Sequence, residues 1–136
     1  MIIKEFISET NKNQMISTLL SYYRVGSVKV KQKSMKDHAN FDVDRGELQL
    51  STRYKTIKPS QIKQFLITII HEIYHAMDAK KYGWKKFKNM YEMEMNYQIT
   101  IGKDKYDDNK YEIKAERFGQ KNWSQWKSRF KKQGLL

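Results

Sequence analysis

Apolar residues recur at intervals of three and four positions in several stretches of the chain, which is the spacing of an amphipathic helix. Residues 11–24 have this spacing, and Gly26 marks the expected end of the helix. A longer helix is predicted over residues 61–81, with Ser60 as its N-cap, because no glycine or proline interrupts the stretch. Its apolar face is formed by Ile62, Phe65, Leu66, Ile69, Ile70 and Ile73.

Between these two helices, apolar and polar residues alternate, which is the pattern of half-buried strands. Residues 27–33 alternate two valines with lysines and predict one strand. Residues 39–43 and 47–51 flank a turn at 44–46 and are predicted to pair as a β-hairpin. The expected fold class is therefore α+β, with a small antiparallel or mixed sheet beside the helices.

Two further helices are predicted over residues 84–97 and 110–132, with an acidic loop at 102–109. The last helix has one face made of Glu112, Ala115, Glu116, Gly119, Trp123, Trp126 and Phe130. The small residues on this face are expected to let another helix approach closely. Its aromatic residues are expected to be core, although the basic residues between them leave nucleic-acid stacking as an alternative.

The composition restricts the chemistry that the chain can perform. It contains no cysteine, which excludes disulfides, thiolate zinc sites and thiol catalysis, so any metal site must use histidine and carboxylate ligands. The net charge of +12 predicts attraction to nucleic acid, anionic lipid or acidic protein. The longest apolar run, residues 65–70, is too short to span a membrane. Residues 1–9 lack the apolar core of a secretory signal, and a cytoplasmic location is expected.

The predicted helix 61–81 contains His71-Glu72-Ile73-Tyr74-His75, an H-E-x-x-H motif. Residues four apart lie one above the other on a helix, so the two imidazoles can bind one metal ion. Glu72 then lies beside the ion, where it can accept a proton from a water molecule that the ion activates. His71 and His75 fall nearly opposite the apolar face, which separates the site from the core.

A catalytic zinc site needs a third protein ligand. No histidine follows His75, so this ligand is expected among the later carboxylates: Asp78, Glu92, Glu94, Asp104, Asp107, Asp108, Glu112 and Glu116. Asp78 lies too far along the same helix to close the coordination sphere easily. Glu112 and Glu116 lie at one end of an otherwise apolar stripe, where a zinc ion would compensate their charge. Alternatively, they are rim residues of an ordinary amphipathic helix.

The H-E-x-x-H motif followed by Glu112-x-x-Ala115 resembles the gluzincins, the thermolysin-type zinc peptidases. The run that continues to Phe118 and Gly119 is also similar to that of the ImmA/IrrE-type peptidases of mobile elements. The size and the order of the motifs resemble minimal gluzincins, the single-domain forms. Where the gluzincin ligand helix has Asn, Ser and Asp, this chain has Tyr111, Ala115 and Glu116.

The resemblance implies a zincin-like fold, with residues 1–136 as one metallopeptidase domain. It implies Zn²⁺ as the cofactor, with His71, His75 and Glu112 as the metal ligands. Glu116 would orient His71 through a hydrogen bond, and Glu72 would be the general base. The resemblance also implies a tyrosine that holds the oxyanion, with candidates Tyr97, Tyr106 and Tyr111. His38, outside the motif, is expected to be a surface histidine.

The function predicted from these observations is that of a zinc-dependent metallopeptidase, acting on a protein or peptide in the cytoplasm of a bacterial or phage-infected cell. The alternative is a basic protein associated with nucleic acid, in which zinc is structural or the peptidase site is vestigial. The charge of +12 favours this alternative, whereas the intact Glu72 disfavours it, because a structural zinc site needs no base. Weak, non-specific binding to nucleic acid or to an acidic protein is expected on either interpretation.

Overall fold

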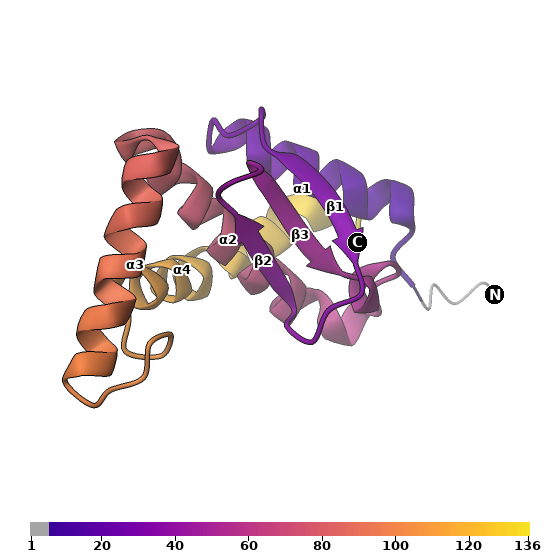
Figure 1. Ribbon diagram of the computed structural model, residues 1–136. Helices are drawn as coiled ribbons and strands as arrows, with labels where there is room; N and C mark the ends of the chain where they lie inside the picture. The colour runs from indigo at the N-terminus through magenta and orange to yellow at the C-terminus, as the bar shows by residue number, and fades with distance from the viewer. Residues whose placement is uncertain (1–5) are drawn as a thin grey trace.

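Four helices and a three-stranded sheet make up residues 6–136, the part of the chain that the computed structural model describes (Figure 1). The prediction about a secretory signal rests largely on residues 1–5, which lie outside this part. The elements are α1 (Glu9–Tyr22), β1 (Lys29–Lys33), β2 (Ala39–Asp42), β3 (Glu47–Ser51), α2 (Ile62–Tyr82), α3 (Trp84–Thr100) and α4 (Lys110–Lys132). The predicted α+β class is confirmed. None of the described helices is both apolar enough and long enough to cross a membrane.

The sheet is mixed, with the strand order β1-β3-β2. The predicted hairpin is confirmed, because β2 and β3 pair antiparallel, with Phe41 opposite Leu48. Its turn begins at Asp42, whose carboxylate accepts hydrogen bonds from the backbone nitrogens of Asp44 and Arg45, at 3.1 and 3.2 Å. Gly46 closes the turn with a φ of +61°, a conformation that glycine adopts without strain. β1 pairs with β3 in parallel, so β2 lies at the opposite edge of the sheet.

Helix α1 packs its apolar side into the core, as its spacing predicts, but it ends earlier than expected. The helix stops at Tyr22 because Arg24 adopts a left-handed conformation with a φ of +61°, two residues before Gly26. The prediction for the first strand is correct in location only, because Val28 is buried while Val30 remains 39% exposed beside an open hollow. The buried Lys12 connects α1 to the sheet through a 2.8 Å hydrogen bond from Nζ to Gln32.

Helix α2 is the central element of the fold and lies behind the sheet in the view of Figure 1. All six residues of its predicted apolar face are at most 4% exposed. Its start differs from the prediction, because Pro59–Gln61 form a 3₁₀ turn before the helix and Ser60 is not its N-cap. The side chain of Gln61 accepts a 2.9 Å hydrogen bond from the backbone nitrogen of Lys58 instead.

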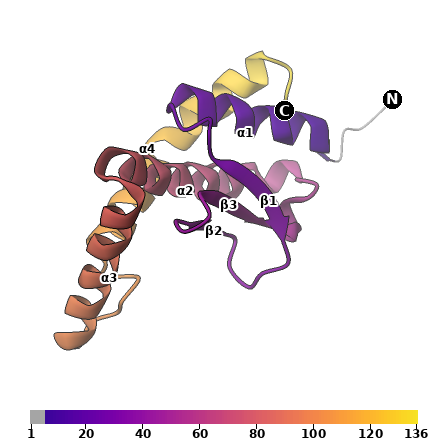
Figure 2. The same cartoon turned by 45° about the horizontal axis from the view of Figure 1, so that its top comes forward.

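Helices α3 and α4 complete the molecule. α3 projects away from the other elements in both views (Figure 2), and the acidic loop predicted at 102–109 leads from it into α4. α4 has the predicted bounds and crosses α2 at close range. Trp126 and Phe130 are buried in the core, and the Trp126 indole donates a 2.9 Å hydrogen bond to Tyr23. These two aromatic side chains are therefore core residues and are not available to stack on bases.

The close approach of α2 and α4 depends on a glycine. A Cβ atom added at Gly119 would lie 2.8 Å from the backbone oxygen of Ile67 on α2. Ala115, one turn earlier on the same face, is fully buried. The prediction that small residues on the last helix admit a neighbouring helix is therefore confirmed, and the same two helices carry the predicted metal ligands.

We expect Gly119→Ala to lower the free energy of unfolding by about 1–3 kcal/mol, because the added methyl group would force two helix backbones apart. Gly26→Ala is the matched control, since an added Cβ there meets nothing within 4 Å. Urea denaturation followed by circular dichroism measures both variants. Alanine by itself favours a helix over glycine by about 1 kcal/mol, so without a steric clash the variant would be as stable as the wild type or more stable. Such a result would contradict the prediction.

Candidate metal centre

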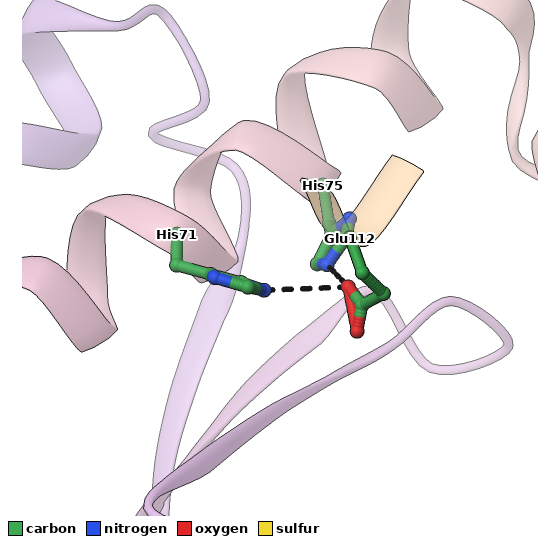
Figure 3. Close-up of side chains that lie close together, drawn as sticks. All are labelled: His71, His75 and Glu112. Carbon is green, nitrogen blue, oxygen red and sulfur yellow. Dashed lines mark hydrogen bonds and ion pairs between the residues drawn. The ribbon is translucent and has the colours of Figure 1, made fainter. Parts of the chain in front are cut away.

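Two turns of α2 and the first turn of α4 bring His71, His75 and Glu112 together (Figure 3). One potential ligand atom from each residue lies within 4.8 Å of the other two. His71 Nε2 is 3.3 Å from Glu112 Oε1, and the same carboxylate oxygen contacts His75 Nε2. The structure thus brings the three predicted metal ligands into one cluster, although Glu112 is 37 positions beyond His75 in the chain.

The three side chains fit a zinc ion in their chemistry, and one of their separations has the expected length. Two imidazoles and one carboxylate form a donor set typical of catalytic zinc, which keeps a further position for water or substrate. Zinc–ligand bonds of about 2.0–2.2 Å in a tetrahedral arrangement place neighbouring ligand atoms about 3.3–3.6 Å apart. The separation of His71 Nε2 and Glu112 Oε1 agrees with this, whereas His75 Nε2 and Glu112 Oε1 lie closer together and would have to move apart to admit the ion.

The position of Glu112 follows from the way α4 begins. Asn109, which is fully buried, caps the helix by accepting a 2.9 Å hydrogen bond from the backbone nitrogen of Tyr111. Tyr111 packs its ring against Phe87 and Tyr91 of α3. The cap and this aromatic contact fix the first turn of α4, so that the next side chain, Glu112, is directed toward α2.

Glu116 lies one turn further along α4 and contacts the other side of the His71 ring. Its Oε2 is 2.8 Å from His71 Nδ1, and its Oε1 accepts a 3.1 Å hydrogen bond from Gln120. A hydrogen bond at Nδ1 fixes the orientation of the ring and leaves Nε2 free to bind a metal. Glu116 is thus placed where the predicted orienting residue should be. In the described residues, the buried Nδ1 of His75 has no such partner.

The charges of the cluster stabilise one another. Burial alone would lower the pKa of His71, but the hydrogen bond to Glu112 and the negative charges of Glu112 and Glu72 raise it to about 9. Burial would raise the pKa of Glu112, but its hydrogen bonds to His71 and His75 hold it well below its usual range. A proton on Nε2 of His71 therefore competes with a metal ion for that nitrogen.

Glu72 lies beside the three candidate ligands without joining their cluster. Its Oε1 is 3.9 Å from His71 Nε2, which is too long for a hydrogen bond, and the residue is only 8% exposed. Burial raises the pKa of its carboxyl group, while the charges of His75 and His71 act in the opposite direction. No side chain or backbone group of residues 6–136 forms a hydrogen bond with this carboxylate, so it is free to exchange a proton with a bound molecule.

The cluster lies at a cleft between the edge strand β2 and helix α3. This cleft has a volume of about 720 Å³ and is lined by Glu72, His75 and Glu112 together with residues of β2 and α3. A second hollow lies on the other side of Glu112 and reaches His71, Arg117 and Lys121. The candidate centre is therefore accessible from two sides, and a chain longer than the cleft could continue past it.

The tyrosine candidates differ in their placement. Tyr106 lines both hollows, Tyr111 is buried behind Phe87, and Tyr97 is 51% exposed and does not line the cleft. Tyr91, which was not among the predicted candidates, lines the cleft beside Glu112. Burial and the charge of Glu112 raise the pKa of its hydroxyl, which stays protonated at neutral pH.

A pattern in the sequence could have identified Tyr91. Phe87, Tyr91 and Met95 recur every four residues, and all three line the cleft from one face of α3.

The remaining histidine and acidic candidates lie outside the cluster. Glu92 and Asp107 line the cleft, and Asp78 is partly buried on α2. Glu94 accepts a 2.8 Å hydrogen bond from the backbone nitrogen of Lys110, while Asp104 and Asp108 bond within their own loop. His38 is an exposed histidine, as expected, with its ring bonded to Tyr54 and Arg53. Within residues 6–136, no other three such donors lie as close together as His71, His75 and Glu112.

No protein-family model matches the chain, and no match is found among curated proteins or solved structures.

Proposed function

We propose that the chain is a zinc-dependent metallopeptidase of the gluzincin type, with a zincin-like fold. The observation that carries the proposal is the convergence of His71, His75 and Glu112 at a cleft that also holds Glu72, whose carboxylate has no hydrogen-bond partner within residues 6–136. A site that only bound a structural ion would need neither the cleft nor a free base beside the ligands.

Each residue has a separate task in the proposed reaction. His71, His75 and Glu112 would hold the zinc ion, and Glu116 would keep His71 in position. A bound zinc ion supplies Lewis acidity, which makes water more acidic and polarises the scissile carbonyl. Glu72 accepts the proton of the attacking water and returns it to the leaving amine.

The walls of the cleft provide the remaining groups that peptide hydrolysis needs. Tyr91 keeps its phenolic proton and can donate it in a hydrogen bond to the carbonyl oxygen as that oxygen gains negative charge. β2 has a free edge along the cleft, where an extended peptide can add as a further strand. A protein or peptide substrate, in the cytoplasm of a bacterial or phage-infected cell, is part of this proposal.

Metal analysis combined with a peptide-library digest tests the proposed function. We expect the purified protein to bind about one zinc per chain, because one trio of ligands is present among residues 6–136. Cleavage of the library should stop on addition of a chelator and return when zinc is restored. Zinc binding with no cleavage of any library member or unfolded protein would contradict the proposed peptidase.

Weak, non-specific binding to nucleic acid or an acidic protein stays a prediction based on the charge of +12. Trp126 and Phe130 are buried, so such binding would rest on lysine and arginine side chains and should fall steeply with salt.

A further inference from the structure

The charges that line the cleft are opposite in sign to the charge of the whole protein. The chain has 27 basic and 15 acidic residues. Five acidic residues line the cleft, and one basic residue, Lys88, does so. The five are Asp37, Glu72, Glu92, Asp107 and Glu112. A third of all acidic residues therefore gather around one cleft of a strongly basic protein.

Three of these carboxylates lie outside the metal cluster and form no ion pair with the described residues. Asp37 precedes β2, Glu92 lies on α3, and Asp107 lies in the loop before α4, so the three come from separate elements. All three are exposed, and none forms an ion pair or accepts a hydrogen bond from another of the described residues. The single cation, Lys88, is bound by both carboxylate oxygens of Asp44, at 2.9 and 3.0 Å. The walls of the cleft therefore carry unbalanced negative charge.

A second observation, at Glu72, points to a ligand in the cleft. Glu72 is more than nine-tenths buried, faces the cleft and has no hydrogen-bond partner among the described residues. The wall also contains the apolar side chains of Phe41, Phe87 and Met95. A lysine or arginine side chain has an apolar stem and a charged end, which match an apolar wall bordered by carboxylates.

We infer that the cleft selects peptides with a lysine or arginine side chain next to the bond that is cleaved, an inference that rests on the proposed peptidase function. The stem of this side chain lies against the apolar wall, and its charged end meets Asp37, Glu92 or Asp107. A bound zinc ion does not reverse the selection, because Asp37, Glu92 and Asp107 are not among its ligands and no basic side chain that lines the cleft forms an ion pair with them.

The charge of the whole protein does not cancel this selection. Salt screens interactions between exposed charges beyond about 8–10 Å under physiological conditions. A peptide in the cleft therefore responds mainly to the carboxylates around it, and the distant lysines reduce only the rate at which a basic peptide approaches.

Binding of matched peptides tests the inference separately from catalysis. The probes are three fluorescent nine-residue peptides of alanine and glycine with a central lysine, norleucine or glutamate. Their binding to zinc-loaded Glu72→Gln is measured by fluorescence anisotropy, because this variant is expected to keep the cleft while turnover is strongly slowed. We expect the lysine peptide to bind about fivefold more tightly than the norleucine peptide and the glutamate peptide to bind most weakly.

Substitutions in the same background locate the source of the preference. Combining Asp37→Asn, Glu92→Gln and Asp107→Asn should make the lysine and norleucine peptides bind equally. Glu9→Gln, which removes an exposed carboxylate from α1 outside the cleft, should leave the fivefold preference unchanged. Circular dichroism of each variant shows that the fold is kept.

The outcomes distinguish this inference from the proposed function. Equal binding of the lysine and norleucine peptides, or no measurable binding of any of the three, would overturn the inference. Cleavage of both peptides at equal rates by the wild-type protein would also overturn it, while leaving the peptidase proposal intact. A lysine preference in binding, together with no cleavage of any peptide by the zinc-loaded wild-type protein, would support the inference and overturn the peptidase.

Discussion

Replacing Glu72 by glutamine is expected to lower peptide turnover by about 10²–10⁴-fold while zinc binding and the fold remain unchanged. Glutamine has the shape of glutamate, and the carboxylate it replaces has no hydrogen-bond partner among the described residues. The variant therefore keeps the shape of the side chain and removes its negative charge and the proposed proton acceptor. Loss of the metal is not expected, because Glu72 is not one of the three clustered ligands.

Steady-state cleavage of a single fluorogenic peptide measures this effect, with zinc content determined in the same samples. Glu9→Gln is the control, because it removes one carboxylate of the same kind far from the cleft in α1. Wild-type turnover by Glu72→Gln would refute its role as the base. Loss of zinc from Glu72→Gln would instead make Glu72 a ligand and require a different assignment of the cluster.

The second large effect is expected from Glu112→Gln, which should weaken zinc binding by more than about 100-fold. An amide is a much poorer zinc ligand than a carboxylate, and Glu112 is the acid that contacts both histidines. Glu116→Gln is the matched variant one turn away on the same helix. It should weaken binding by about tenfold, because it acts through the orientation of His71.

Competition with a chromophoric chelator measures both affinities, and circular dichroism shows that the variants are folded. The reverse order, with Glu112→Gln holding zinc like the wild type while Glu116→Gln loses it, would place the third ligand one turn further along α4. Equal affinities for the two variants and the wild type would mean that the carboxylate cluster does not bind the metal.

Some elements could be predicted from the sequence because their causes lie close together in the chain. The four-residue spacing of His71 and His75 places them on one side of a helix whatever the rest of the chain does. The hairpin follows from alternating strands and the turn that ends at Gly46. Helix ends were less predictable, because a single residue such as Arg24 can adopt the terminating conformation before the expected glycine.

Other features depended on contacts between distant segments. The parallel pairing of β1 with β3 brings together strands that are not adjacent in order, which alternation of residue types does not specify. The four-residue spacing of Phe87, Tyr91 and Met95 places them on one helix face, but such a face is usually core, so the packing of α3 was needed to show that it lines the cleft. Val30 shows the reverse case, since its alternation predicted burial but no element covers it fully.

The sequence by itself determined the α+β class, the hairpin, the histidine pair with its adjacent glutamate and the restriction of any metal site to histidine and carboxylate ligands. Each depends on residue types, or on distances of a few residues, which backbone geometry converts directly into position. The tertiary structure decided which acid meets the histidines, since several carboxylates follow His75 and only the crossing of α2 and α4 at Gly119 brings Glu112 to them. It also decided that Asp37, Glu92 and Asp107 line one cleft. These residues come from three separate segments, so their charges lie close together only after the segments have packed.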